Sequence, residues 1–290
     1  MNNVQSLVPI NVEAKTLQVP GARLHYEVRG TGPLLLMIPG APADAGALAG
    51  LADVLADRYT VVTYDQRGLS RSTLTGPPAD TDVTVFADDA HRLLAALGDE
   101  PAHVLGNSGG ALTALALAAR HPGQVRSLIV HEPPLPELLP DRDRWRAAFQ
   151  DVHDTYHLHG AGAAMGKFIT TVDGENAAPP AMPDPSQMPP EALEMMGRIQ
   201  GNLDFFLPHV LLPVLRFTPD LDALRAARTP VVVGVGAASG DGVPALSARV
   251  LADRLGVEPL TFPGDHQGLA LDVAACADLI HTELVRTVPA

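Results

Sequence analysis

The stretch Gly106-Asn107-Ser108-Gly109-Gly110 lies at the junction of two short sequence patterns. The residues before it, 103–105, are predicted to form a strand, and residues 111–120, rich in alanine and leucine, are predicted to form a helix. A serine between glycines can stand on a sharp turn there, because glycine accepts backbone conformations closed to other residues. The helix that begins beneath the serine favours negative charge. The pattern therefore predicts Ser108 as the nucleophile of a catalytic site.

The sequence on either side of this stretch alternates between strands and helices. Short apolar or alternating runs predict strands, and runs with an apolar residue every three or four positions predict helices. The predicted strands are residues 23–28, 34–38, 60–64, 103–105, 125–130, 231–235 and 258–262, and the predicted helices are residues 44–57, 83–97, 111–120, 243–255 and 269–286. This alternation is typical of an α/β fold, with a parallel sheet covered on both faces.

The alternation stops between residues 132 and 220, where no strand pattern is present. Helices are predicted over residues 142–158, 191–206 and 208–217. Five of the seven methionines lie in this part of the chain: Met165, Met182, Met188, Met195 and Met196. A length of 290 residues suits one large domain with an insertion. The expected organisation is a first part of the core at residues 1–132, a helical cap at 133–220 and a second part of the core at 221–290.

The composition narrows the classes of function. Twenty basic and 33 acidic residues give a net charge of −13, which repels phosphate backbones, so no nucleic-acid partner is expected. The single cysteine, Cys276, excludes an intrachain disulfide framework and a multi-cysteine metal site. Residues 1–9 have neither the basic start nor the apolar core of a signal peptide, and no run of residues reads as a membrane span. A cytoplasmic protein without membrane contact is therefore expected.

Three further segments, together with the Ser108 stretch, resemble motifs of the α/β-hydrolase family. Residues 37–42 (MIPGAP) resemble its oxyanion loop, residues 65–68 (DQRG) resemble a turn that braces its sheet, and Gly264-Asp265-His266 resembles its catalytic-histidine loop. The family usually has a histidine before the glycine of the oxyanion loop, where this chain has Pro39. The resemblance covers nearly the whole chain. It implies a mostly parallel twisted sheet flanked by helices, with a helical cap inserted after strand six.

The resemblance also implies roles for individual residues. His266 would take the proton of Ser108 and later donate it to the leaving group. The backbone N–H groups of Ala41 and Gly109 would bind the oxyanion. Pro42 has no N–H, which supports Ala41 as the donor of its loop.

Two acidic residues compete for the third position of the catalytic triad. In many relatives the acid follows strand seven in a Gly-x-x-Asp turn, but Ser239 stands at that position here and Asp241 is two residues late. A second arrangement resembles that of haloalkane dehalogenases and some lactonases, whose acid lies at the end of strand six. Glu132 stands there, and the prolines after it would hold its carboxylate at the strand end. Glu132 is the predicted acid, with Asp241 as the alternative.

The cap is expected to shape the substrate pocket. Phe205 and Phe206, with the cap methionines, could line a pocket over Ser108, which favours an apolar substrate. His153 and His157 have a spacing that can bind a metal, but no His-Glu-x-x-His motif or nearby cysteine accompanies them, so no metal site is predicted. Apolar cap residues could instead face a second subunit, so a homodimer is retained as an alternative.

These observations predict a serine hydrolase that needs no cofactor. It would cleave a carboxylic ester or lactone of a fairly apolar small molecule through an acyl-enzyme. Haloalkane dehalogenases and epoxide hydrolases of this family need an aspartate as the nucleophile, which Ser108 disfavours. A cofactor-free perhydrolase or a C–C-bond hydrolase uses the same three residues and is kept as an alternative. A ligand-binding relative with slow chemistry is the alternative from another class.

Overall fold

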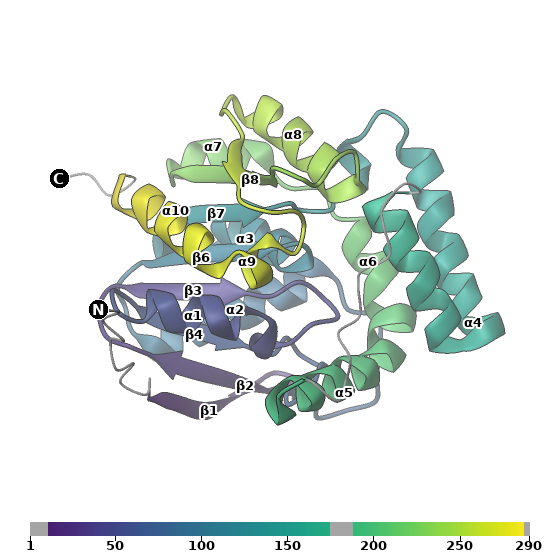
Figure 1. Ribbon diagram of the computed structural model, residues 1–290, viewed down its shortest axis with the longest axis horizontal. Coiled ribbons are helices and arrows are strands. Elements are labelled where there is room, and N and C mark those ends of the chain that lie inside the picture. The colour runs from purple at the N-terminus through teal and green to yellow at the C-terminus, as the bar shows by residue number, and fades with distance from the viewer. Residues whose placement is uncertain (1–10, 175–187, 287–290) are drawn as a thin grey trace, which may run out of the picture.

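The computed structural model describes residues 11–174 and 188–286, and within these ranges its centre is a twisted sheet of nine strands (Figure 1). Eight of them follow the order β1-β2-β4-β3-β6-β7-β8-β9, and the two-residue β5 pairs with β2. The strands are β1 Val12–Val19, β2 Ala22–Arg29, β3 Leu34–Ile38, β4 Thr60–Tyr64, β5 Thr73–Leu74, β6 Ala102–Asn107, β7 Val125–His131, β8 Val231–Gly236 and β9 Leu260–Phe262. From β4 to β9 all neighbours are parallel. The predicted α/β class is confirmed.

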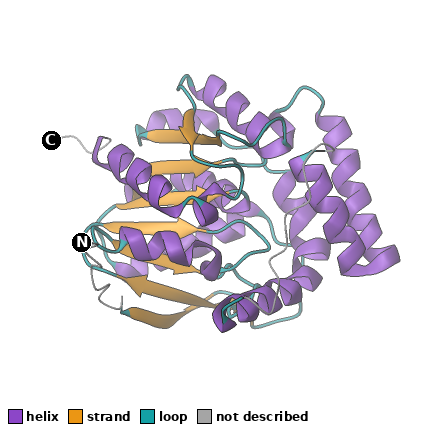
Figure 2. Ribbon diagram, in the orientation of Figure 1, coloured by secondary structure: helices purple, strands orange, loops and turns teal. Residues whose placement is uncertain are grey.

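Helices cover both faces of this sheet (Figures 1 and 2). They are α1 Ala49–Leu55, α2 Val83–Leu97, α3 Gly109–Arg120, α8 Val243–Leu255, α9 Gly268–Leu271 and α10 Val273–Arg286. In β3, Leu35 and Met37 pack with side chains of α1 and α10, whereas Leu36 and Ile38 pack with those of α2, α3 and α8. Burial on both faces explains why most positions of the parallel strands are apolar.

Two of the differences from the predicted elements in the core have a clear physical reason. The strand β1 has no counterpart among the predicted strands, because it is an edge strand in which only Val19 is buried. Its backbone pairs along its whole length with β2, but its side chains carry no apolar alternation. The predicted helix over residues 269–286 is divided at Asp272 into α9 and α10.

A helical insertion separates β7 from β8. β7 is the sixth strand along the chain when the two-residue β5 is left out, so the predicted place of the insertion is confirmed. The insertion contains a short 3-10 helix Pro136–Leu138, α4 Arg142–Asp173, α5 Pro190–Phe205, a π-helical turn Phe206–Val210, α6 Leu211–Leu215 and α7 Leu221–Ala227. The helices α4, α5 and α6 stand together at one end of the sheet (Figure 1). The domain boundaries at residues 132 and 220 stay a prediction.

α4 is longer than the predicted helix over residues 142–158. It continues past Gly160, whose φ of 82° and ψ of 175° are not helical, so α4 consists of two helical halves joined by a kink. Gly162 and Gly166 weaken the helix propensity of the second half. Packing outweighs that weakness, because Met165 and Phe168 contact the large core cluster.

Over the described ranges, no helix combines the length and the apolar character that crossing a bilayer requires. The segment on which the cytoplasmic prediction depends, residues 1–9, lies outside the described residues.

Candidate active site

Ser108 stands on the turn between β6 and α3. Its φ of 51° and ψ of −122° are strained for a residue with a side chain. The turn depends on the small residues around it, because a Cβ on Gly106 would lie 2.6 Å from the Cα of Ala111. A Cβ on Gly110 would lie 2.2 Å from the carbonyl oxygen of Ile38. Close backbone packing therefore holds Ser108 at the end of β6.

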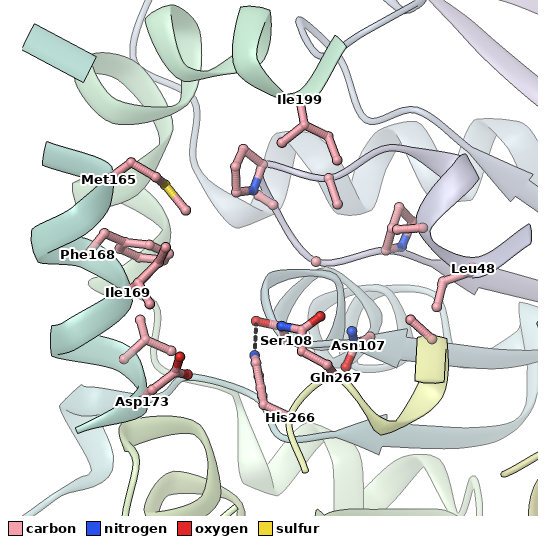
Figure 3. Close-up of a pocket in the computed structure, with 18 residues that line it drawn as sticks. Leu48, Asn107, Ser108, Met165, Phe168, Ile169, Asp173, Ile199, His266 and Gln267 are labelled. Carbon is pink, nitrogen blue, oxygen red and sulfur yellow. Dashed lines mark hydrogen bonds between the residues drawn. The ribbon is translucent and has the colours of Figure 1, made fainter. Parts of the chain in front are cut away.

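His266 lies between β9 and α9 and connects Ser108 with Glu132. Its Nε2 is 3.1 Å from the Oγ of Ser108, a contact drawn in Figure 3, and its Nδ1 is 2.7 Å from Oε2 of Glu132. A carboxylate only accepts hydrogen bonds, so the Nδ1–H of His266 donates to Glu132. Nε2 is then left to accept from the Ser108 hydroxyl.

Glu132 follows the last residue of β7 and is fully buried, with a φ of 48°. Its Oε1 accepts a hydrogen bond of 2.8 Å from the backbone N–H of Gly236, at the end of β8. Burial opposes the ionised form of Glu132. The hydrogen bond and charge of His266, together with the Gly236 N–H, outweigh burial and hold the pKa of Glu132 below its ordinary value. At neutral pH the imidazole therefore faces a fixed, ionised carboxylate.

Asp241, the alternative acid, lies away from His266. Its side chain is 92% exposed, and its charged neighbour is Arg249 at 3.7 Å. Ser239, at the position where relatives often have the acid, lies against Gly236, where an added Cβ would be 2.4 Å from the Ser239 Oγ. The structure thus brings Glu132, rather than Asp241, to the imidazole.

Ala41 and Gly109 lie next to each other beside Ser108. A Cβ on Gly109 would be 3.3 Å from the backbone nitrogen of Ala41. Gly109 is the first residue of α3, so no carbonyl of its own helix is available to its N–H. Within the described residues, the Ala41 N–H donates to no acceptor. Both N–H groups are thus available to an oxygen atom of a molecule bound at Ser108.

Side chains from two other elements support the loop that carries Ala41. The side-chain amide of Gln66 donates to the carbonyl oxygen of Pro39 at 2.9 Å. Asn202 of α5 donates to the carbonyl oxygen of Pro42 at 2.8 Å. The loop lacks the histidine that relatives usually have at position 39, and these two bonds fasten it on either side of Ala41.

A main cavity of about 200 Å³ lies at Ser108, between the core and the cap. The core contributes the loop around Ala41 together with Asn107, Ser108, His266 and Gln267. The last four are labelled in Figure 3. The cap contributes side chains of α4 and α5: Met165, Phe168, Ile169, Val172, Asp173 and Ile199. The walls are mostly apolar, and no lysine or arginine is part of the described lining.

A small pocket of about 30 Å³ adjoins Ser108 as well. It shares Ala41, Ser108, Phe168 and Val172 with the main cavity, but His266 is not part of its lining. The rest of the lining is apolar apart from backbone groups: Gly109, Pro134, Phe206, Leu211, Val214 and Leu215. Ser108 therefore faces two spaces of different size, and only the larger one contains the imidazole.

The cap residues named from the sequence have different positions. Met165 lines the main cavity and Phe206 lines the small pocket. Phe205 instead packs on the turn at Gly68, where an added Cβ would be 2.3 Å from its ring. Met182 lies outside the described residues.

Sequence reasoning misses Asp173 as a residue of this site. It is the last residue of α4, in the second half of the helix, whose glycines weaken the helical pattern in the sequence. A lone carboxylate in a segment without periodicity carries no signal that would mark it.

His153 and His157 lie on α4 outside the lining of both spaces. Their Nε2 atoms are 3.4 Å apart. Neither residue is part of any group of three or more potential metal ligands among the residues described.

Comparison with known proteins agrees with the fold. Residues 33–171 match the α/β-hydrolase fold family. Structures similar to this chain include a thermophilic esterase from Thermogutta terrifontis, with a TM-score of 0.72 and 20% identity over 97% of this chain and 99% of that one. They also include a carboxylesterase from Nitrososphaera gargenis, with a TM-score of 0.73 and 19% identity over 94% of this chain and 98% of that one. At these identities the two structures share the fold with this chain.

A relative closer in sequence extends the match along the chain. The uncharacterized hydrolase YraK of Bacillus subtilis is 35% identical over 273 residues, which cover 93% of this chain and 95% of that protein. With this alignment over nearly its full length, the chain belongs to the α/β-hydrolase family.

Proposed function

We propose that this protein is a serine hydrolase that cleaves carboxylic esters or lactones through an acyl-enzyme. The observation that carries the proposal is the position of His266, with one ring nitrogen 3.1 Å from Ser108 and the other 2.7 Å from the buried Glu132. A nucleophile, a base and a group that orients the base are the three parts that acyl transfer requires. Glu132 takes the place of the acid, and Asp241 does not.

The reaction begins when the Oγ of Ser108 attacks the carbonyl carbon and its proton passes to Nε2 of His266. The carbonyl oxygen becomes negatively charged and accepts hydrogen bonds from the N–H groups of Ala41 and Gly109. The C–O bond to the leaving group then breaks, and His266 gives its proton to the departing oxygen. Water attacks the acyl-enzyme with His266 again as base, which releases the acid and restores Ser108.

The two spaces beside Ser108 suggest how an ester is oriented. His266 must reach the departing oxygen, and it lines only the main cavity, so the alcohol part occupies that cavity. The acyl chain is left with the small pocket. A space of about 30 Å³ holds on the order of two water-sized groups, which suits an acyl chain of about two to four carbons.

A serine-directed fluorophosphonate probe tests the nucleophile. We expect mass spectrometry to locate the adduct on Ser108, and we expect His266→Ala to abolish labelling, because the hydroxyl then has no base. His159→Ala on the exposed face of α4 is the matched control and should label like the wild type. Absence of labelling in the folded wild type, or labelling that survives in His266→Ala, would overturn the proposal.

A series of p-nitrophenyl esters tests the orientation. The acetate and butanoate should be cleaved faster than the octanoate, because only a short chain fits the small pocket. An octanoate cleaved faster than the butanoate would place the acyl chain in the main cavity instead.

A further inference from the structure

One carboxylate in the main cavity has no side-chain partner among the described residues. Asp173, at the end of α4, points into the cavity from the side opposite the core loops (Figure 3). Within the described part of the chain, no hydrogen bond or ion pair joins its side chain to another residue. Asp173 is half-buried, whereas the fully buried carboxylates described elsewhere are paired, such as Asp89 with Arg67 at 2.6 Å. An unpaired carboxylate in a cavity that faces Ser108 is available to a bound molecule.

The surroundings of Asp173 favour a positive charge nearby. Burial raises the pKa of Asp173; His266 opposes the rise, and Asp265 and Glu132 add to it. No lysine or arginine is part of the described lining of the main cavity to balance the charge of Asp173. A cation in the cavity would gain the attraction of Asp173, and an anion would be repelled.

The position of Asp173 relates it to one part of the substrate. Asp173 and His266 both line the main cavity, and neither lines the small pocket. The imidazole must reach the departing oxygen, so Asp173 faces the alcohol part of an ester rather than its acyl chain. Phe168 lies in the same lining, and an aromatic face can also attract a cation.

We propose that Asp173 is a specificity-determining residue that selects esters whose alcohol part carries a positive charge, such as esters of amino alcohols. The inference rests on the serine hydrolase function proposed above. Asp173 takes no part in bond making; its carboxylate pairs with the ammonium group while Ser108 attacks the carbonyl carbon.

Two propanoate esters of the same shape test the charge preference. One is the choline ester, and the other is the 3,3-dimethylbutyl ester, in which carbon replaces the ammonium nitrogen. We expect the wild type to show a kcat/KM roughly tenfold higher for the choline ester, as suits an ion pair in a partly solvated cavity. Asp173→Asn keeps the shape and removes the charge, so it should abolish this preference while cleavage of the neutral ester is kept. Asp154→Asn, which makes the same change on the same helix outside the cavity, should leave the preference unchanged.

The outcomes separate the two proposals. Equal kcat/KM for both esters in the wild type, or equal loss for both in Asp173→Asn, overturns the role of Asp173 and leaves the serine hydrolase intact. If Ser108 is labelled by the fluorophosphonate but neither ester is cleaved, the role of Asp173 is tested by how well each free alcohol protects Ser108 from labelling. Choline should then protect the wild type better than 3,3-dimethylbutanol does, and equal protection overturns the inference. Failure of all labelling overturns both proposals.

Discussion

The loops at the strand ends and the helices of the cap are packed in different ways. At the strand ends, an added Cβ on Gly110 would meet the backbone of Ile38 at 2.2 Å. In the cap, an added Cβ on Gly166 or Gly197 would meet no described atom within 4 Å beyond the adjoining residues and backbone of its own helix. The candidate catalytic groups thus rest on closely packed backbone, whereas the cap helices that line the cavity contain glycines with open space at the Cβ position. Under the proposed function, the first region fixes the reacting groups and the second shapes the part of the cavity that receives the substrate.

The two regions are nonetheless joined at the loop that carries Ala41. Arg198 of α5 donates to Asp44 at 2.6 Å, and Asn202 of the same helix donates to Pro42 at 2.8 Å. Asn202 also accepts a hydrogen bond of 2.5 Å from the N–H of Ser70. α5 therefore contacts the very loop whose N–H group would bind the oxyanion, and this connection is the place where the cap can affect the reaction.

The largest expected effect is that of Glu132→Gln in the first region. Glutamine keeps the shape of the side chain, but it lacks the charge that orients His266 and balances the imidazolium. We expect kcat to fall about 10³–10⁴-fold, as for the loss of the equivalent charge in other triads. Ester hydrolysis measures the effect, and the urea midpoint shows whether the variant is folded.

Asp241→Asn is the control for this loss of one carboxylate. Its side chain is 92% exposed, and its activity should remain that of the wild type. Full activity in Glu132→Gln together with a large loss in Asp241→Asn would reverse the assignment of the acid.

A smaller but still large effect is expected for Gly110→Ala. The new methyl group would lie 2.2 Å from the carbonyl oxygen of Ile38 and 2.5 Å from that of Pro39. Both neighbours are backbone atoms that cannot rotate away, so the loop carrying Ala41 must shift. We expect the free energy of unfolding to fall by about 3 kcal/mol, as for other overpacked sites, and ester hydrolysis to fall with it. Urea denaturation measures the first effect, and an unchanged midpoint would contradict the packing described.

The core should also lose stability in acid. Burial lowers the pKa of His103 and of His131 to about 4, against an ordinary value of about 6.5. As pH falls below 6.5 the unfolded chain binds these protons and the folded chain does not, so stability present at neutral pH is lost progressively down to about pH 4. Between about pH 7 and pH 5, each histidine contributes a loss of about 2 kcal/mol.

The variant His103→Gln isolates one of these contributions. Its free energy of unfolding should fall by about 2 kcal/mol less than that of the wild type over the same pH interval. His159→Gln, which removes an exposed imidazole from α4, is the control. An equal pH dependence in His103→Gln and the wild type would show that His103 titrates alike in both states.

The strand ends could be predicted from the sequence because their constraints are local. The turn at Ser108 can be recognised in the sequence because few residues other than glycine fit beside the serine. The prolines after Glu132 mark the end of β7 in the same way. The edge strand β1 cannot be predicted in this way, because it is held by backbone pairing with β2 and most of its side chains are exposed, so its sequence has no apolar alternation.

The cap could be predicted only in part, because its constraints come from tertiary packing. Helix propensity predicts α4 as far as residue 158, and the second half forms despite its glycines because Met165 and Phe168 pack on the core. The role we infer for Asp173 depends on where that half ends. Its position in the cavity follows from the kink and the packing, neither of which has a pattern in the sequence.

The smallest expected effects are those of a glycine-to-alanine substitution at two sites of α4, which test how well the cap tolerates an added methyl group. Gly166 lies within the helix and has open space at its Cβ, so Gly166→Ala should raise the free energy of unfolding by about 0.5–1 kcal/mol. Gly160 also has open space, but its φ of 82° favours glycine, so Gly160→Ala should lower stability by about 1 kcal/mol or more. Urea denaturation measures both changes in the free energy of unfolding. If the cap unfolds before the core, hydrogen exchange of the α4 amides measures these changes instead. Opposite signs at two sites six residues apart would show that backbone conformation, not contact, limits substitution in the cap. A loss at Gly166 would instead reveal contacts as close as those at the strand ends, and the contrast between the two regions would no longer hold.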